Sequence, residues 1–146
     1  MSAAPSFPPS DAARRMLDGN LGGLVESLAW TAARAGLLSA GMYVAGERDE
    51  LWRKAFAGSL AVEAFVVGWA LIAPTDQQRS VPSYNIALNG SPLAIAGTFA
   101  ARSAIVYGGM RAGGYHRKAF RNALAGTAAI EAAVLVYAAL TKPPAP

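Results

Sequence analysis

Four ionisable side chains stand alone inside long apolar stretches of this sequence: Arg34, Glu63, Arg102 and Glu131. Burying a charge in apolar surroundings is costly unless a group of opposite sign accompanies it. The signs alternate along the chain, so each half of the sequence supplies one cation and one anion. We therefore expect arginine–glutamate pairs, formed either within each half or crosswise between the halves.

The neighbours of these charges fit an inward-facing site. Ser59 and Thr127 each precede a glutamate by one helical turn, which places a hydroxyl within reach of the carboxylate. Gly41 and Gly109 each follow an arginine by seven residues, on nearly the same helix face, where a missing side chain lets another helix approach. The pattern predicts one polar unit at the centre of the fold.

Two interpretations of this unit remain open. In the first, the pairs are structural and fix which helices pack together and in which register. In the second, Glu63 and Glu131 are protonation or ion-coupling sites, tuned by Arg34 and Arg102, as in small proton-driven transporters. Charge balance favours the first, because an arginine stabilises the ionised form of its partner and makes it a poor reversible proton carrier.

Other kinds of chemistry find little support in the sequence. There is no cysteine and a single histidine, His116, which excludes thiolate metal sites, a cysteine nucleophile and haem held by two histidines of one copy. No phosphate-binding glycine loop or Ser–His–Asp arrangement occurs. We expect no enzymatic activity, no cofactor and no metal. The net charge of +4 is spread over several short segments without a groove motif, so no nucleic-acid partner is expected.

The elements that must position the four charges are apolar on all sides. Hydrophobic residues make up 53% of the 146 residues and charged residues only 15%. Stretches of 18–20 apolar residues cross a hydrocarbon core of roughly 30 Å as helices. The sequence thus predicts an all-α integral membrane four-helix bundle; the alternative is a soluble alanine-rich protein buried in a large assembly. The four predicted spans are Leu28–Gly46, Ala55–Ala73, Leu93–Met110 and Asn122–Leu140.

The chain also repeats itself with a shift of 68 residues. Ala32-Ala33-Arg34 recurs at 100–102, and the segment 57–64 around Glu63 recurs at 125–132 around Glu131. Residues 53–56 recur at 117–120 with a shift of 64, which would require small insertions or deletions in the loop. We expect two tandem hairpin repeats related by a pseudo-twofold axis. The predicted division is a tail at 1–20, hairpins at 21–74 and 93–141, a connector at 75–92 and a tail at 142–146.

Basic residues predict the orientation in the membrane. The loops 47–54 and 111–121 hold more arginine and lysine than the tails and the connector, so both loops should face the cytoplasm or an organellar matrix and both termini the other side. Residues 11–20 form either a short interfacial helix or a solvated tail. Anionic lipid headgroups are expected to contact the loop residues Arg53, Lys54, His116, Arg117 and Lys118.

Together these features predict a non-enzymatic protein of an inner, cytoplasmic or organellar membrane. Its expected role is that of a structural or accessory subunit in a larger assembly, such as a respiratory or photosynthetic complex or a membrane-containing virion. Its expected partners are membrane lipids and other membrane subunits. The alternative is a small ion or proton-coupled transporter or channel that uses the glutamate–arginine pairs.

Overall fold

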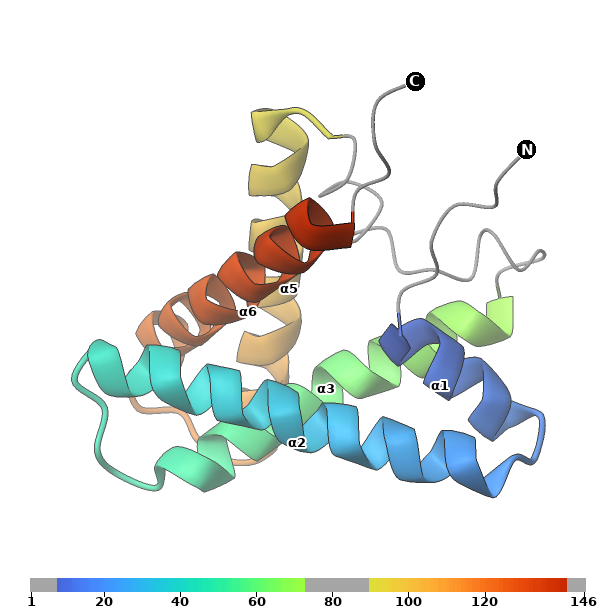
Figure 1. The fold of residues 1–146 in the computed structure, drawn as a ribbon. Helices are drawn as coiled ribbons and strands as arrows, with labels where there is room; N and C mark the ends of the chain where they lie inside the picture. Colours follow the sequence, from blue (N-terminus) through green and yellow to red (C-terminus); the bar gives the residue numbers. More distant parts are fainter. Residues whose placement is uncertain (1–7, 73–89, 142–146) are drawn as a thin grey trace.

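The computed structural model describes residues 8–72 and 90–141, and within these ranges it is helical and has no strand. Residues 1–7, 73–89 and 142–146 lie outside the described residues. They hold the first part of the predicted N-terminal tail, the end of the predicted second span, most of the predicted connector and all of the predicted C-terminal tail. Figure 1 shows the arrangement of the five described helices. Their bounds are α1 Pro8–Leu17, α2 Leu21–Val44, α3 Leu51–Ile72, α5 Pro92–Ala112 and α6 Ala119–Thr141.

Three of these helices, α3, α5 and α6, are long and apolar enough to cross a membrane. Helix α2 has 24 residues but is not one of the three. It begins seven residues before the predicted span, because the Asn20 side chain caps it by accepting a hydrogen bond from the Gly23 amide at 3.0 Å. The added turns bring Glu26, two glycines and a serine into the helix.

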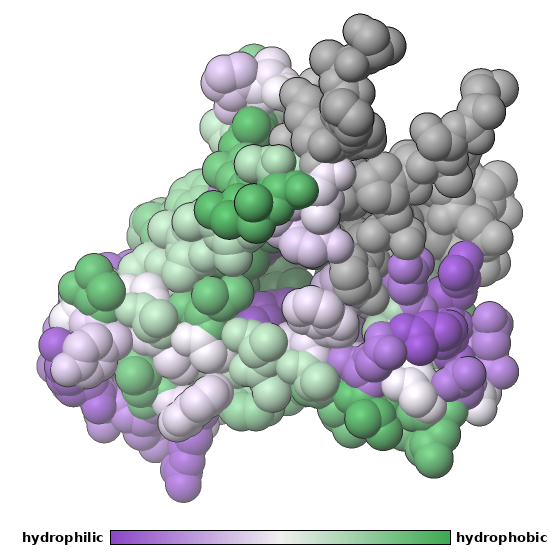
Figure 2. All heavy atoms as spheres, in the orientation of Figure 1, coloured by the Kyte–Doolittle hydropathy of each residue, from purple (hydrophilic) through white to green (hydrophobic). Residues whose placement is uncertain are grey.

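Helix α1 is a packed element and not a solvated tail. Ala12 and Ala13 have no exposed surface, and α1 lies against both α2 and α3. The contact with α2 is close, because a Cβ atom on Gly23 would lie only 2.5 Å from the Met16 backbone nitrogen. Arg15 also pairs with Glu26 of α2. Figure 2 shows hydrophilic surface around this helix, so α1 forms a polar cover at one end of α2 and α3.

The long helices form two hairpins. Hairpin 1 is α2 with α3 and hairpin 2 is α5 with α6; in addition, α2 packs against α6 and α3 against α5. In Figure 1, α5 points across the direction of α2, so the hairpins diverge from a shared region, and the four-helix bundle that the sequence predicted is not confirmed. The shared region lies towards the loop ends of the helices, where small residues let the backbones approach.

The centre of this shared region is filled by a few apolar side chains. Leu38 and Met42 of α2 and Val106 and Met110 of α5 have no exposed surface. Most other large apolar side chains face outwards, as they do on a protein surrounded by lipid. Examples on the four long helices are Leu24, Leu28, Leu60, Leu71, Leu93, Phe120, Val136 and Leu140.

The two hairpins share their local geometry with a constant shift of 68 residues. Helices α2 and α5 end 68 positions apart, and so do the starts of α3 and α6. Within the loops, the positive φ angles of Gly46 and Glu50 recur at Gly114 and Lys118. Both loops therefore have the same length, and the insertion or deletion that a shift of 64 would require is not present.

Candidate functional site

The first buried ion pair joins the two helices of hairpin 1. Both terminal nitrogens of Arg34 lie 3.3 Å from Oε2 of Glu63, and both side chains are largely buried. Arg34 also donates to the backbone carbonyl of Ser59 at 3.3 Å and to its hydroxyl at 3.4 Å. Ser59 in turn donates to the backbone carbonyl of Thr31 at 2.7 Å. The Ser59 hydroxyl thus contacts the arginine and α2, whereas the sequence placed it near the carboxylate.

The second buried ion pair joins the two helices of hairpin 2 in the same way. Arg102 of α5 donates to Oε2 of Glu131 of α6, and both side chains are again largely buried. Thr127 occupies the place of Ser59 and is fully buried, but its hydroxyl has no hydrogen-bond partner in the described part of the chain. Of the two arrangements left open by the sequence, the structure has pairing within each hairpin.

Gly41 and Gly109 lie where the two hairpins meet. A Cβ atom on Gly41 would come within 2.2 Å of the carbonyl oxygen of Ala125 in α6. On Gly109 it would come within 2.5 Å of the carbonyl oxygen of Ala57 in α3. Real Cβ atoms do not approach backbone so closely, so both positions require glycine in this packing.

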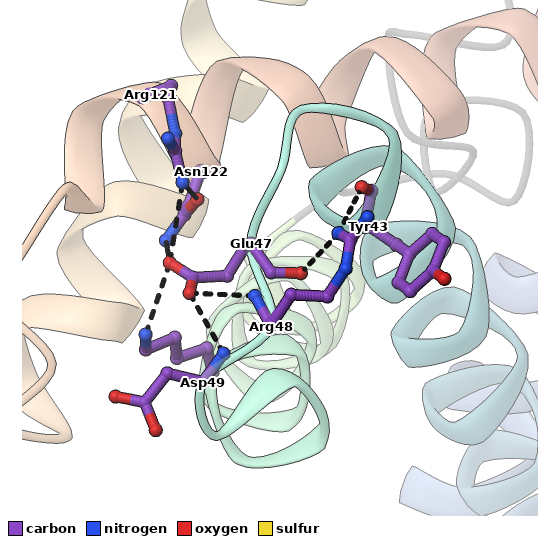
Figure 3. A network of polar contacts seen from close by, with 7 residues as sticks. Tyr43, Glu47, Arg48, Asp49, Arg121 and Asn122 are labelled. Carbon is purple, nitrogen blue, oxygen red and sulfur yellow. Dashed lines mark hydrogen bonds and ion pairs between the residues drawn. The ribbon is translucent and has the colours of Figure 1, made fainter.

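A second polar cluster lies in the loop between α2 and α3, around the buried side chain of Glu47 (Figure 3). Its Oε2 atom accepts hydrogen bonds from Asn122 at 2.8 Å and Arg121 at 3.5 Å, and it pairs with Lys54 at 3.2 Å. Because Asn122 and Arg121 belong to α6, this carboxylate joins hairpin 1 to hairpin 2. We call these four residues the Glu47 network.

The loop backbone completes the environment of the carboxylate. The amides of Arg48 and Asp49 both donate to Oε1 of Glu47 at 3.0 Å. Arg48 itself turns back over the Tyr43 ring, 3.6 Å from its centre, and donates to the Tyr43 carbonyl at 2.6 Å. Figure 3 shows that the Arg48 side chain points towards Tyr43 and the Glu47 carboxylate points towards α6.

The pKa of Glu47 reflects these contacts. Burial disfavours the charged form and by itself would raise the pKa. The hydrogen bonds from Asn122, the Asp49 amide and Lys54, together with the charge of Lys54, outweigh burial and lower the pKa from 4.5 to about 2. Glu47 is therefore ionised at neutral pH, and its negative charge is balanced within the protein.

The residues expected to touch lipid headgroups divide into two groups. Arg53, His116, Arg117 and Lys118 are exposed, and Arg53 makes a surface pair with Glu50 at 3.3 Å. Lys54, by contrast, is buried, and its ammonium group pairs with Glu47 and is directed away from the surface. The expectation for Lys54 is therefore wrong, because the loop carboxylate draws its side chain inwards.

Sequence reasoning missed Glu47 and Asn122. One available signal was a carboxylate directly after a predicted span, in a loop that holds three acidic and three basic residues. Another was an amide side chain at the first position of a predicted span. With a shift of 68, Asn122 corresponds to Lys54, so equivalent positions of the two hairpins donate to one carboxylate.

No known family model, curated protein or solved structure matches this chain. Within residues 8–72 and 90–141, no group of three or more histidine, aspartate or glutamate side chains is placed to hold a metal ion. The geometry offers paired internal charges, an inter-hairpin carboxylate and an outward apolar surface, and the function is argued from these features.

Proposed function

We propose that this protein is a non-enzymatic integral membrane protein that acts as a structural or accessory subunit of a larger membrane assembly. A respiratory or photosynthetic complex and a membrane-containing virion are the assemblies that fit such a subunit. The observation that carries the proposal is the pairing of Glu63 with Arg34 and of Glu131 with Arg102. A carboxylate neutralised by an arginine of its own hairpin fixes helix pairing and is poorly suited to carry protons back and forth.

The outward surface supports the same proposal. Less than half of each apolar segment of α3, α5 and α6 is buried inside the protein. The surface that remains is made of leucine, valine, alanine and aromatic side chains, which pack equally well against lipid chains and against the transmembrane helices of another subunit. A protein of this size with so much uncovered apolar surface is suited to fill a place between larger subunits.

We further infer that the two hairpins are copies of one unit. The supporting observations are equal loop lengths, positive φ angles at corresponding loop positions, and the mutual contacts of Gly41 and Gly109 with α6 and α3. Duplication of a two-helix unit gives parallel repeats related by an axis along the membrane normal.

Purification from the native membrane in a mild detergent tests the proposal. We expect this chain to elute in a particle larger than its own monomer with bound detergent, together with other membrane chains in fixed ratio. A stable monomer without partners, obtained under conditions that keep known complexes of the same membrane intact, would contradict the proposal.

One observation favours the alternative, a small proton-coupled transporter or channel. The Oε1 atom of Glu63 is buried and has no hydrogen-bond partner among the described residues, so one carboxylate oxygen remains available for another ligand. Flux measurements on vesicles containing only this protein separate the two functions. A pH-dependent flux that Glu63→Gln or Glu131→Gln abolishes would support transport, and no flux above that of empty vesicles would support the structural role.

A further inference from the structure

An open groove lies between α2 and α6, close to the loop ends of the two helices. Its volume is about 420 Å³, and its walls consist of small apolar residues. Gly41 and Ala125 form its floor side by side, because the missing side chain of Gly41 lets the two backbones approach. In a membrane, such a surface meets hydrocarbon chains and not water. The groove is also lined by Val44 and Ala45 of α2 and by Ala128 and Ala129 of α6.

Arg121 lies at the loop end of this groove. On α6 it precedes Ala125 by four residues, so it shares the helix face that lines the groove. On the α2 side, Glu47 follows Ala45 by two residues, and its carboxylate lies 3.5 Å from Nη2 of Arg121 (Figure 3). The guanidinium group is therefore placed where the two walls of the groove end.

The positive charge of Arg121 is only partly balanced. Glu47 carries one negative charge, and Lys54 lies closer to it, at 3.2 Å, than Arg121 does at 3.5 Å. Two cations thus share one carboxylate. The Arg121 side chain is also 38% exposed, and its Nε atom has no hydrogen-bond partner among the described residues. An anion placed beside Arg121 would balance the second cation.

With the shift of 68, the same positions fall at the junction of α3 and α5, where the side chains differ. Ala128 corresponds to Leu60, which is much larger than alanine and would occupy such a groove. Arg121 corresponds to Arg53, whose side chain is 74% exposed and pairs with Glu50 of its own loop. These two differences supply matched controls for a site between α2 and α6.

We propose that the groove between α2 and α6 binds one anionic phospholipid, with an acyl chain along its alanine walls and the phosphate group against Arg121. Apolar surface followed by a cation at the loop end matches the order of chain and headgroup in such a lipid. A guanidinium group binds phosphate oxygens through parallel hydrogen bonds, and basic pockets between transmembrane helices hold anionic headgroups. A neutral apolar helix of another subunit would fill the groove but would leave the charge of Arg121 unbalanced. The inference rests on the proposed membrane location and adds a specific lipid to it.

Native mass spectrometry of the purified full chain in detergent tests this site. The probes are dioleoyl phosphatidylglycerol, which is anionic, and dioleoyl phosphatidylcholine, which has the same chains and no net charge. We expect the wild type to bind one phosphatidylglycerol at least about fivefold more tightly than one phosphatidylcholine, which corresponds to the attraction of one basic residue for an anionic headgroup. Equal affinities for the two lipids would overturn the proposal.

The headgroup contact is tested by a pair of arginine variants. Arg121→Gln should remove the preference for phosphatidylglycerol, because the cation at the end of the groove is lost. Arg53→Gln, at the corresponding position of hairpin 1, should keep the preference. Equal losses in the two variants would show that the basic loops attract the lipid without a defined site, and would overturn the assignment to Arg121.

The acyl-chain contact is tested by filling the groove. Ala128→Leu introduces the side chain found at the corresponding Leu60, and we expect it to weaken the binding of both lipids about tenfold, because the added carbon atoms take the place of the chain. Ala139→Leu, exposed on the same helix and outside the groove, should bind like the wild type. Unchanged binding by Ala128→Leu would overturn the groove site, and so would a wild-type dimer that this variant abolishes, since a second copy would then occupy the groove. This variant leaves the Glu47 network intact, so its result stands even if Arg121→Gln is unstable. The chain is purified without other subunits, so a failure here leaves the proposed accessory role to its own test.

Discussion

At the scale of single residues, Glu47 accepts hydrogen bonds or ion pairs from five groups, and two of its partners lie on the other hairpin. Glu47→Gln removes the charge that balances Lys54, so a buried ammonium group is left unpaired. We expect the free energy of unfolding to fall by about 3–5 kcal/mol. Denaturation in mixed micelles with increasing dodecyl sulfate measures this change. Glu50→Gln in the same loop is the control, because its pair with Arg53 is exposed and should cost at most about 1 kcal/mol.

The same carboxylate makes stability depend on pH. Its pKa is about 2 in the folded protein and near 4.5 when it is unpaired, so its contribution is complete above pH 4.5 and is lost as the pH falls towards 2. We expect the free energy of unfolding to drop by about 3 kcal/mol more in the wild type than in Glu47→Gln across this window. Parallel curves for the two proteins between pH 4.5 and pH 2 would show that Glu47 is not held in this way.

At the scale of helices, the hairpins meet through two glycines. Gly41→Ala and Gly109→Ala would each drive a methyl group into the backbone of the opposite hairpin, and we expect each to lower the free energy of unfolding by about 1–3 kcal/mol. Gly108→Ala is the matched control beside Gly109, because a Cβ atom at Gly108 meets nothing within 4 Å. It should be neutral or slightly stabilising, since alanine favours helix over glycine. Equal losses for Gly108→Ala and Gly109→Ala would show that close packing is not the cause.

The helices were also the most predictable part of the molecule. Unbroken apolar stretches of spanning length predicted the positions of α3, α5 and α6 to within a few residues, because a helix satisfies its own backbone groups and needs no distant partner. The glycine contacts could be anticipated from their spacing to Arg34 and Arg102. The packing of α1 and the inward turn of Lys54 could not, because both depend on groups that only the folded chain brings together.

At the scale of the whole molecule, the contacts between the hairpins gather at the loop end. The Glu47 network joins the first loop to the start of α6, and Gly41 and Gly109 lie in the last turns of α2 and α5. Beyond this region the hairpins diverge, and α1 lies against α2 and α3 (Figure 1). The hairpins are thus joined at the loop end, while apolar side chains such as Leu93 and Leu140 are exposed at the other end.

This arrangement also predicts which segments share a side of the membrane. Because Glu47 of the first loop bonds Asn122 just after the second, both loops lie on one side, and their excess of arginine and lysine predicts that this side is the cytoplasm or matrix. We expect Asp49→Cys and His116→Cys to be labelled by an impermeant maleimide only in inverted vesicles. Ser91→Cys, before α5 at the opposite end of hairpin 2, should be labelled only in right-side-out vesicles. The reverse labelling of all three would invert the orientation, and labelling of the two loops from opposite sides would contradict the hairpin arrangement, since a bond between Glu47 and Asn122 would then have to cross the membrane.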